Sequence, residues 1–64
     1  MSLREKFQDW SRLKNLCVQI RSSHDPEVKS ELEEIFYDRV RKYSRRYHEY
    51  FNEDKNPLDK LRGR

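Results

Sequence analysis

The stretch that decides the fold is residues 25–53, which read DPEVKSELEEIFYDRVRKYSRRYHEYFNE. Apolar residues recur along it at intervals of three and four, the spacing of one face of an amphipathic α-helix. From Phe36 onward the intervals alternate four, three, four, three, as in a coiled-coil seam. Because no helix breaker follows Pro26 before Asn56-Pro57, we expect one long helix over about residues 26–53.

Asp25 and Pro26 are the clearest boundary signal in the chain. An aspartate side chain accepts a hydrogen bond from the free N–H groups of a first helical turn, and proline fits the first helical position. Glu27 adds a negative charge beside the positive end of the helix dipole. We therefore expect a turn over residues 22–25 and a helix directly after it.

A shorter helix is expected before the turn, over about residues 3–21. Ser2 and Glu5 have the spacing of a capping box at its start. One broad face of this helix is apolar and carries Leu3, Phe7, Trp10, Leu13, Leu16, Cys17 and Ile20. Because a connection of about four residues sets two helices side by side, the expected fold class is an all-α antiparallel hairpin.

We expect a single helical-hairpin domain over residues 1–64, with a tail at residues 54–64. Two alternatives stay open for Leu58 and Leu61 of the tail. They either fold back to cover Tyr50 or Phe51, or become ordered only on a partner.

The composition indicates that the hairpin needs a partner. The 64 residues are 33% hydrophobic and 42% charged, and a chain of this size buries little surface. Two helices alone bury too few apolar side chains to offset the conformational entropy lost on folding. We therefore expect the core to be completed by association, either as a four-helix bundle of two copies or by docking on another protein.

The aromatic residues of the second helix are the expected binding surface. That helix is predicted to outlast the first, so Tyr47, Tyr50 and Phe51 would have no partner on the first helix, and uncovered apolar surface often marks a binding site. The predicted partner-binding stripe consists of Trp10, Phe36, Val40, Tyr43, Tyr47, Tyr50 and Phe51. This predicts a non-enzymatic protein–protein interaction module, such as an adaptor, a regulatory subunit or an accessory subunit of an assembly.

Charge is segregated along the second helix. Residues 25–38 carry six acidic and one basic side chain, whereas residues 39–48 carry five basic and no acidic ones. In an antiparallel pair of chains these halves would attract each other, which favours a homodimer. The basic patch consists of Arg39, Arg41, Lys42, Arg45 and Arg46.

Nucleic-acid binding by this basic patch is the alternative function. Cations interleaved with Tyr43 and Tyr47 have the composition of a surface that binds phosphates and stacks on bases. Lys6, Arg12 and Lys14 of the first helix would be additional contacts. Helical geometry turns the tyrosines toward the apolar side, so the protein-binding interpretation is preferred.

Catalytic, metal and cofactor signatures are missing from the sequence. Cys17 is expected in apolar surroundings, where a thiol is a poor nucleophile, and His24 and His48 lack metal-ligand spacing. We therefore expect no enzymatic activity, no metal and no cofactor. No apolar run has the length of a signal peptide or a membrane span, and one cysteine fits the cytoplasm or another reducing compartment.

Overall fold

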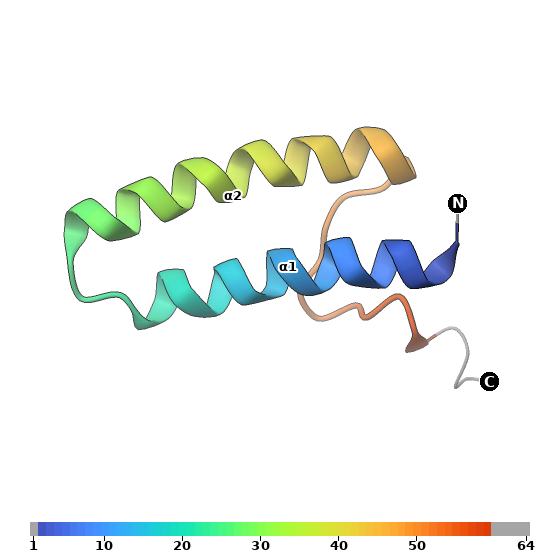
Figure 1. Cartoon of the computed structure of the whole chain (residues 1–64), viewed down its shortest axis with the longest axis horizontal. Coiled ribbons are helices and arrows are strands. Elements are labelled where there is room, and N and C mark those ends of the chain that lie inside the picture. Colours follow the sequence, from blue (N-terminus) through green and yellow to red (C-terminus); the bar gives the residue numbers. More distant parts are fainter. Residues whose placement is uncertain (1, 60–64) are drawn as a thin grey trace.

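The computed structural model describes residues 2–59 and contains two α-helices that pack against each other. Helix α1 spans Leu3–Ser22 and helix α2 spans Pro26–Tyr47. They run antiparallel, joined by a short extended connection (Figure 1). Residues 2–59 contain no strand, so the described part of the chain is the all-α hairpin that the periodicity predicts.

Both helices begin where the sequence predicts. Ser2 Oγ accepts a hydrogen bond from the Glu5 N–H at 3.2 Å, and the Glu5 carboxylate accepts one from the Ser2 N–H at 3.2 Å. The Asp25 carboxylate accepts a hydrogen bond from the Glu27 N–H at 2.9 Å, with Pro26 in the first turn. These caps satisfy backbone donors that have no partner inside their helix.

The predicted end of the second helix at Glu53 is wrong, because α2 stops at Tyr47. His48 adopts the left-handed conformation, with φ 57° and ψ 37°, and its N–H donates to the Ser44 carbonyl at 2.9 Å. Such a residue ends a helix and redirects the chain. The early stop has a packing cause, since it allows Phe51 to turn back onto the helices.

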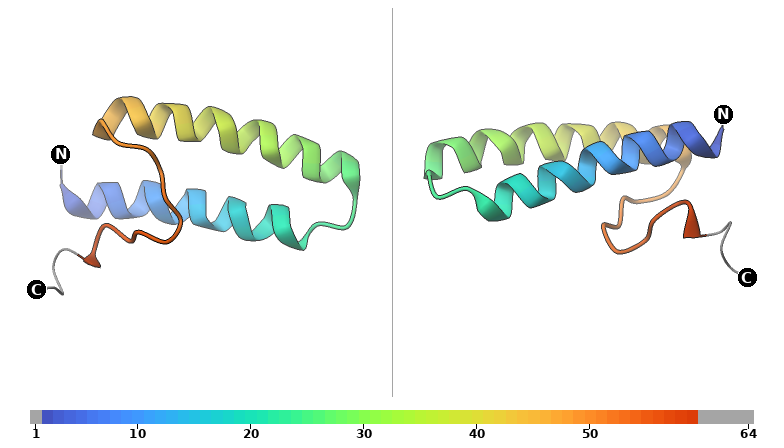
Figure 2. Two further views of the ribbon diagram at one scale, coloured as in Figure 1. Left: turned by 180° about the vertical axis from the view of Figure 1, so that it is seen from behind. Right: turned by 60° about the horizontal axis from the view of Figure 1, so that its bottom comes forward.

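Residues 48–59, which we call the strap, leave the end of α2 and cross α1 on one face of the hairpin (Figures 1 and 2). The Phe51 ring lies 6.3 Å from the Trp10 ring, 5.9 Å from Phe36 and 6.0 Å from Tyr43, measured between centroids. The Trp10 indole N–H donates to the Asn52 carbonyl at 2.8 Å. The strap is therefore a third contributor to the core.

Ion pairs with α1 hold the first half of the strap at Glu49 and Glu53. Lys6 Nζ lies 2.7 Å from Glu49, while the Glu53 carboxylate pairs with Arg21 and with Lys14 at 3.6 Å. Pairs with exposed members stabilise a fold only slightly, so they position the strap more than they stabilise it.

The part of the chain predicted as a tail is only partly described. Pro57 is buried and Leu58 is half-buried, which places residues of the predicted tail against the rest of the molecule. Leu61 lies outside the described residues.

The core lies in the half of the hairpin away from the turn. Its buried centre consists of Trp10, Leu13 and Tyr43. Half-buried around this centre are Phe7, Leu16, Phe36, Val40, Tyr47 and Phe51. Neither α1 nor α2 has an apolar stretch long enough to cross a bilayer.

Candidate interaction surface

Most of the predicted partner-binding stripe packs inside the chain. Trp10 and Tyr43 are buried, with 8% and 4% of their surface exposed. The half-buried members are Phe36, Val40, Tyr47 and Phe51. Tyr50 alone among the seven residues is fully open to solvent, at 85% exposure. The strap explains this result, because Phe51 covers aromatic rings that a bare hairpin would leave exposed.

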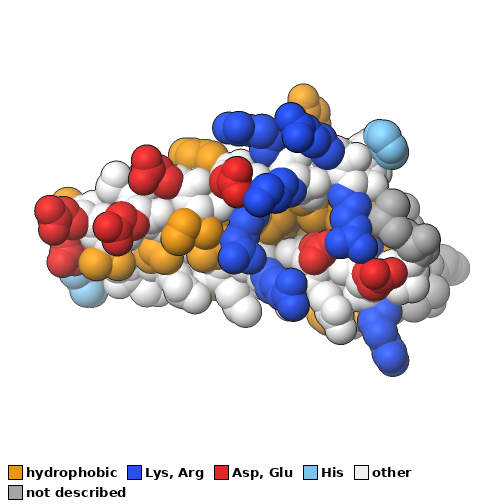
Figure 3. Space-filling model, turned by 45° about the horizontal axis from the view of Figure 1, so that its top comes forward, with side chains coloured by type: hydrophobic (Ala, Val, Ile, Leu, Met, Phe, Trp, Pro, Cys, Tyr) orange, Lys and Arg blue, Asp and Glu red, His pale blue; other side chains and the backbone are white. Residues whose placement is uncertain are grey.

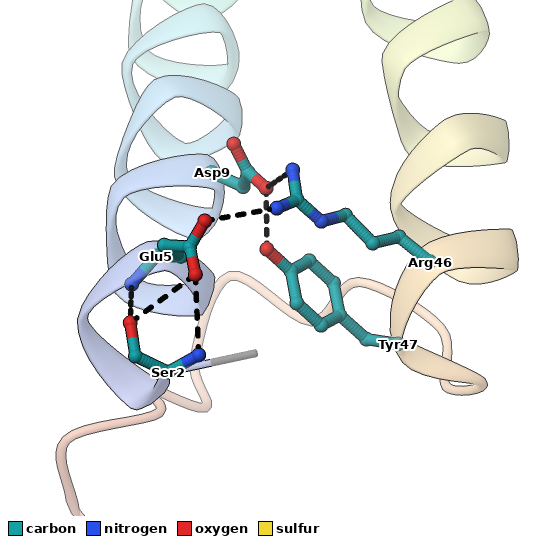
Figure 4. A network of polar contacts seen from close by, with 5 residues as sticks. All are labelled: Ser2, Glu5, Asp9, Arg46 and Tyr47. Atoms are coloured by element: carbon teal, nitrogen blue, oxygen red, sulfur yellow. Dashed lines mark hydrogen bonds and ion pairs between the residues drawn. The ribbon is translucent and has the colours of Figure 1, made fainter.

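Tyr47 has a partner on α1, contrary to the prediction that it lies beyond that helix. Its O–H donates to the Asp9 carboxylate at 2.5 Å, and the Arg46 guanidinium donates to the same carboxylate at 3.3 Å (Figure 4). Arg46 also donates to Glu5 at 3.2 Å, and its guanidinium lies 5.4 Å from the Tyr47 ring centroid. This network ties the end of α2 to the start of α1.

The network shifts the ionisation of its members. Burial, reinforced by the hydrogen bond to Asp9, raises the pKa of Tyr47 to about 12. The hydrogen bond from the Ser2 N–H lowers the pKa of Glu5, which keeps this carboxylate charged toward Arg46. The phenol of Tyr47 is therefore a proton donor to Asp9 at any physiological pH.

Cys17 is half-buried beside the strap. Burial raises the pKa of its thiol, and the nearby Glu53 carboxylate acts in the same direction. A thiol that stays protonated at neutral pH is a poor nucleophile. Its surroundings give Cys17 a packing role.

Within residues 2–59 no segment covers the face of the hairpin opposite the strap, and we call this the open face. Its α2 side is a row of side chains at intervals of four and three, namely Val28, Leu32, Ile35, Arg39, Lys42 and Arg46. Toward the turn this row is apolar, with Val28 and Ile35 45% and 44% exposed. Toward the other end it is basic, and Lys and Arg side chains gather there (Figure 3).

Between the helices the open face is hollowed into a pocket of about 210 Å³, which we call the basic pocket. Its floor includes Leu13 and Tyr43, which are 2% and 4% exposed. Its walls carry four cations and one carboxylate, namely Arg12, Arg39, Lys42, Arg46 and Asp9.

The predicted basic patch divides between two sides of α2. Arg39, Lys42 and Arg46 line the basic pocket, while helical geometry turns Arg41 and Arg45 to the outer side, and all five are exposed. The additional cations of α1 also separate. Arg12 joins the basic pocket, whereas Lys6 and Lys14 pair with the strap.

Sequence reasoning missed Asp9 as part of the basic pocket and the strap as the cover of the opposite face. Asp9 resembles any other polar residue of an amphipathic helix, and its importance depends on the residues that α2 sets opposite it. The strap carries no motif of its own. Both features depend on tertiary contacts between residues about 40 positions apart in the chain.

Within residues 2–59, no three His, Cys, Asp or Glu side chains are grouped so that they could hold a metal ion. Comparisons of the chain with known protein families, with curated proteins and with solved structures find no match. The geometry of the open face is therefore the basis for a functional proposal.

Proposed function

We propose that the chain is a non-enzymatic protein–protein interaction module that binds a partner helix on its open face. The observation that carries this proposal is the uncovered row from Val28 to Arg46, which is apolar in its first half and basic in its second. Burial of the apolar half supplies affinity, and the cations set the orientation of the partner. The matching partner is an amphipathic helix whose apolar side chains are flanked by carboxylates.

The first half of α2 is itself a helix of this kind. Val28, Leu32 and Ile35 lie beside acidic side chains in this half, namely Glu27, Glu31, Glu34 and Asp38. We therefore propose a second copy of the chain as the occupant of the open face, so that two hairpins form a four-helix bundle. Docking on a different protein is the alternative outcome.

A twofold axis close to Ile35 gives the arrangement that the charges favour. Antiparallel packing of the two α2 helices about this axis sets Ile35 against Ile35 of the second copy. It also sets Glu31 near Arg39 and Lys42 of the second copy, and the symmetry repeats this contact. The acidic half of each α2 then lies against the basic half of the other.

The small core supports association through this face. In the described part of the chain the buried centre of the core is three side chains, with Pro57 of the strap buried as well, while Val28 and Ile35 keep nearly half of their surface in water. Removing apolar surface from water stabilises by about 25 cal/mol per Å². A second hairpin on the open face would provide this burial where the strap does not reach.

Compensating charge reversals test the proposal. The first variant is Glu31→Lys, and the second combines Arg39→Glu with Lys42→Glu. Each variant alone faces like charges across the twofold axis, so each should dimerise roughly tenfold or more weakly than the native chain. Mixed together they should recover a heterodimer, detected by sedimentation velocity.

The matched control is Arg41→Glu with Arg45→Glu, which changes the net charge by the same amount on the outer side of α2. This variant should dimerise like the native chain. If the native chain is monomeric at about 100 µM, where a standard interface is well populated, the second copy is not the occupant. If the mixture fails to associate while the native chain dimerises, a different face is used.

Nucleic-acid binding is a second candidate function, favoured by the exposure of all five residues of the basic patch. It would use Arg41 and Arg45, which dimerisation does not need. The Arg41→Glu, Arg45→Glu variant should then lose binding to a single-stranded oligonucleotide, measured at several salt concentrations. Unchanged oligonucleotide binding by this variant would exclude the outer side as the contact.

A further inference from the structure

We propose that the basic pocket is a binding site for a phosphate monoester group. Arg12 approaches it from α1, while Arg39, Lys42 and Arg46 approach it from α2. The guanidinium group presents paired hydrogen-bond donors that match the oxygens of a phosphate, and cations on the two helices can bind the same phosphate group. Binding of a phosphate group is a function beyond the docking of a partner helix, and it does not require that docking.

The two arginines that line the basic pocket from opposite helices have no ion-pair partner in the described part of the chain. Within residues 2–59, neither Arg12 nor Arg39 forms a salt bridge or a side-chain hydrogen bond, although the chain has twelve acidic residues. Bringing two unpaired cations to one pocket is electrostatically unfavourable. An anion between them would remove this repulsion.

The acidic groups around the basic pocket are already engaged. The Asp9 carboxylate accepts hydrogen bonds from Tyr47 and Arg46, and Asp38 pairs with Lys42 at 3.2 Å. The Lys42–Asp38 pair is open to solvent on both side chains, so it contributes little and leaves Lys42 able to turn to a ligand. With the Glu5–Arg46 pair, these contacts leave Arg12 and Arg39 as the two lining cations that have no ion pair within residues 2–59.

The shape and charge of the basic pocket favour a single anionic group. It is a hollow of about 210 Å³ with Leu13 and Tyr43 beneath it. The neighbouring hollow on α2 shares Arg39 and Lys42 but also carries Glu34 and Asp38, so the cationic lining does not continue along the helix. A low-dielectric floor strengthens the attraction between the cations and a bound anion. A nucleic-acid backbone would instead need cations spaced along the surface. Arg41 and Arg45 on the outer side of α2 would add cations of that kind.

The site has a consequence for the proposed dimer. Glu31 of a second copy would approach Arg39 and Lys42, so a phosphate group and the second copy compete for the same cations. By linkage, phosphate would weaken dimerisation by the same factor as dimerisation weakens phosphate binding. The binding test below uses Glu31→Lys, so that failure of the dimer and failure of the site are distinguishable.

The test titrates phenyl phosphate into the Glu31→Lys chain at constant ionic strength and follows the arginine Nε–H signals by NMR. We expect saturable shifts of the Arg12 and Arg39 signals, with no saturable change at Arg41 or Arg45. Adding Arg12→Gln and Arg39→Gln should weaken binding by roughly tenfold or more. The matched control adds Arg41→Gln and Arg45→Gln, removes the same charge and should bind like the parent.

Circular dichroism establishes that each variant is folded before binding is compared. Linear, non-saturating shifts of all four arginines would overturn the proposal, because they indicate general ion screening. Equal loss of binding in the two glutamine variants would overturn it as well. A single-stranded oligonucleotide that binds more tightly than phenyl phosphate, and loses affinity in both variants, would identify a nucleic-acid backbone as the ligand instead.

Discussion

Asp9 is the residue on which the end of the hairpin away from the turn depends. One carboxylate on α1 accepts hydrogen bonds from two successive residues of α2, Arg46 and Tyr47 (Figure 4). It fixes the last turn of α2 against α1, directly before the chain leaves the helix at His48. It also pairs with Arg46, so Arg12, Arg39 and Lys42 are the cations of the basic pocket that Asp9 does not neutralise.

The raised pKa of Tyr47 predicts a pH dependence of stability. The folded-state pKa of about 12 lies above the ordinary tyrosine value of about 10, so the folded state holds the phenolic proton more tightly than the unfolded state. The stabilisation is complete below pH about 10 and is lost as the pH rises toward about 12. Below that range, Tyr47→Phe should lower the free energy of unfolding by about 1 kcal/mol through the lost hydrogen bond.

Urea unfolding at a series of pH values measures this effect in the native chain and in Tyr47→Phe. The difference between the two chains should shrink as the pH rises from about 10 to about 12. Burial also raises the pKa of Tyr43, but that residue is present in both proteins and cancels in the comparison. A difference that stays constant over this range would contradict the account of Tyr47.

The strap is the element that completes the core, and its two adjacent aromatic residues have opposite environments. Phe51 contacts three aromatic rings, whereas the neighbouring Tyr50 is 85% exposed. Phe51→Ala should lower the free energy of unfolding by about 2 kcal/mol, since a half-buried ring is lost. Tyr50→Ala should change it by less than about 0.5 kcal/mol.

Thermal unfolding followed by circular dichroism measures both substitutions. In Phe51→Ala the fluorescence of Trp10 should also shift toward that of a wetter indole, because Phe51 and the strap cover this ring. Equal destabilisation by the two alanine substitutions would mean that the strap does not pack as described.

The C-terminus of α2 offers a stabilising substitution. His48 has a positive φ of 57°, which costs a residue with a Cβ atom more than it costs glycine. His48→Gly should raise the free energy of unfolding by about 0.5 to 1 kcal/mol, measured by urea unfolding. His24→Gly, in the connection between the helices at negative φ, should lower it instead. A lower stability of His48→Gly would contradict the left-handed conformation of residue 48.

The helix starts were predictable from the sequence and the end of α2 was not. Ser2, Asp25 and Pro26 act through local chemistry that the sequence displays directly. Near His48 the sequence has no glycine or proline, and the apolar spacing continues through Tyr50 and Phe51. The chain leaves the helix there because Phe51 fits between α1 and α2, and local propensity cannot reveal such a contact.

On the scale of the whole molecule, the two faces of the hairpin differ. One is covered by the strap, and the other presents the apolar row, the basic pocket and the acidic end near the turn (Figures 2 and 3). The sequence predicted Arg39, Lys42 and Arg46 of this face as parts of the basic patch, and Arg12 as an additional basic contact. It did not predict the face itself, because the spacing of apolar residues favours the more aromatic seam of α2 as the surface for a partner.

That seam became the core for a physical reason. A row with Phe36, Tyr43 and Tyr47 buries more apolar surface than a row with Val28, Leu32 and Ile35, so the strap and α1 cover the first and leave the second. Hydrophobic periodicity identifies both rows but does not show which one the chain covers with its own residues.

A cysteine cross-link at Ile35 tests most directly whether the open face is the docking surface for a second copy. The chain would carry Cys17→Ser, so that Ile35→Cys supplies the only thiol, and mild oxidation would be followed by gel electrophoresis. Because Ile35 lies near the proposed twofold axis, we predict rapid formation of a disulfide-linked dimer. The control is Tyr37→Cys, an exposed residue on the other side of α2, which should cross-link slowly. Equal or faster cross-linking at position 37 would contradict the account.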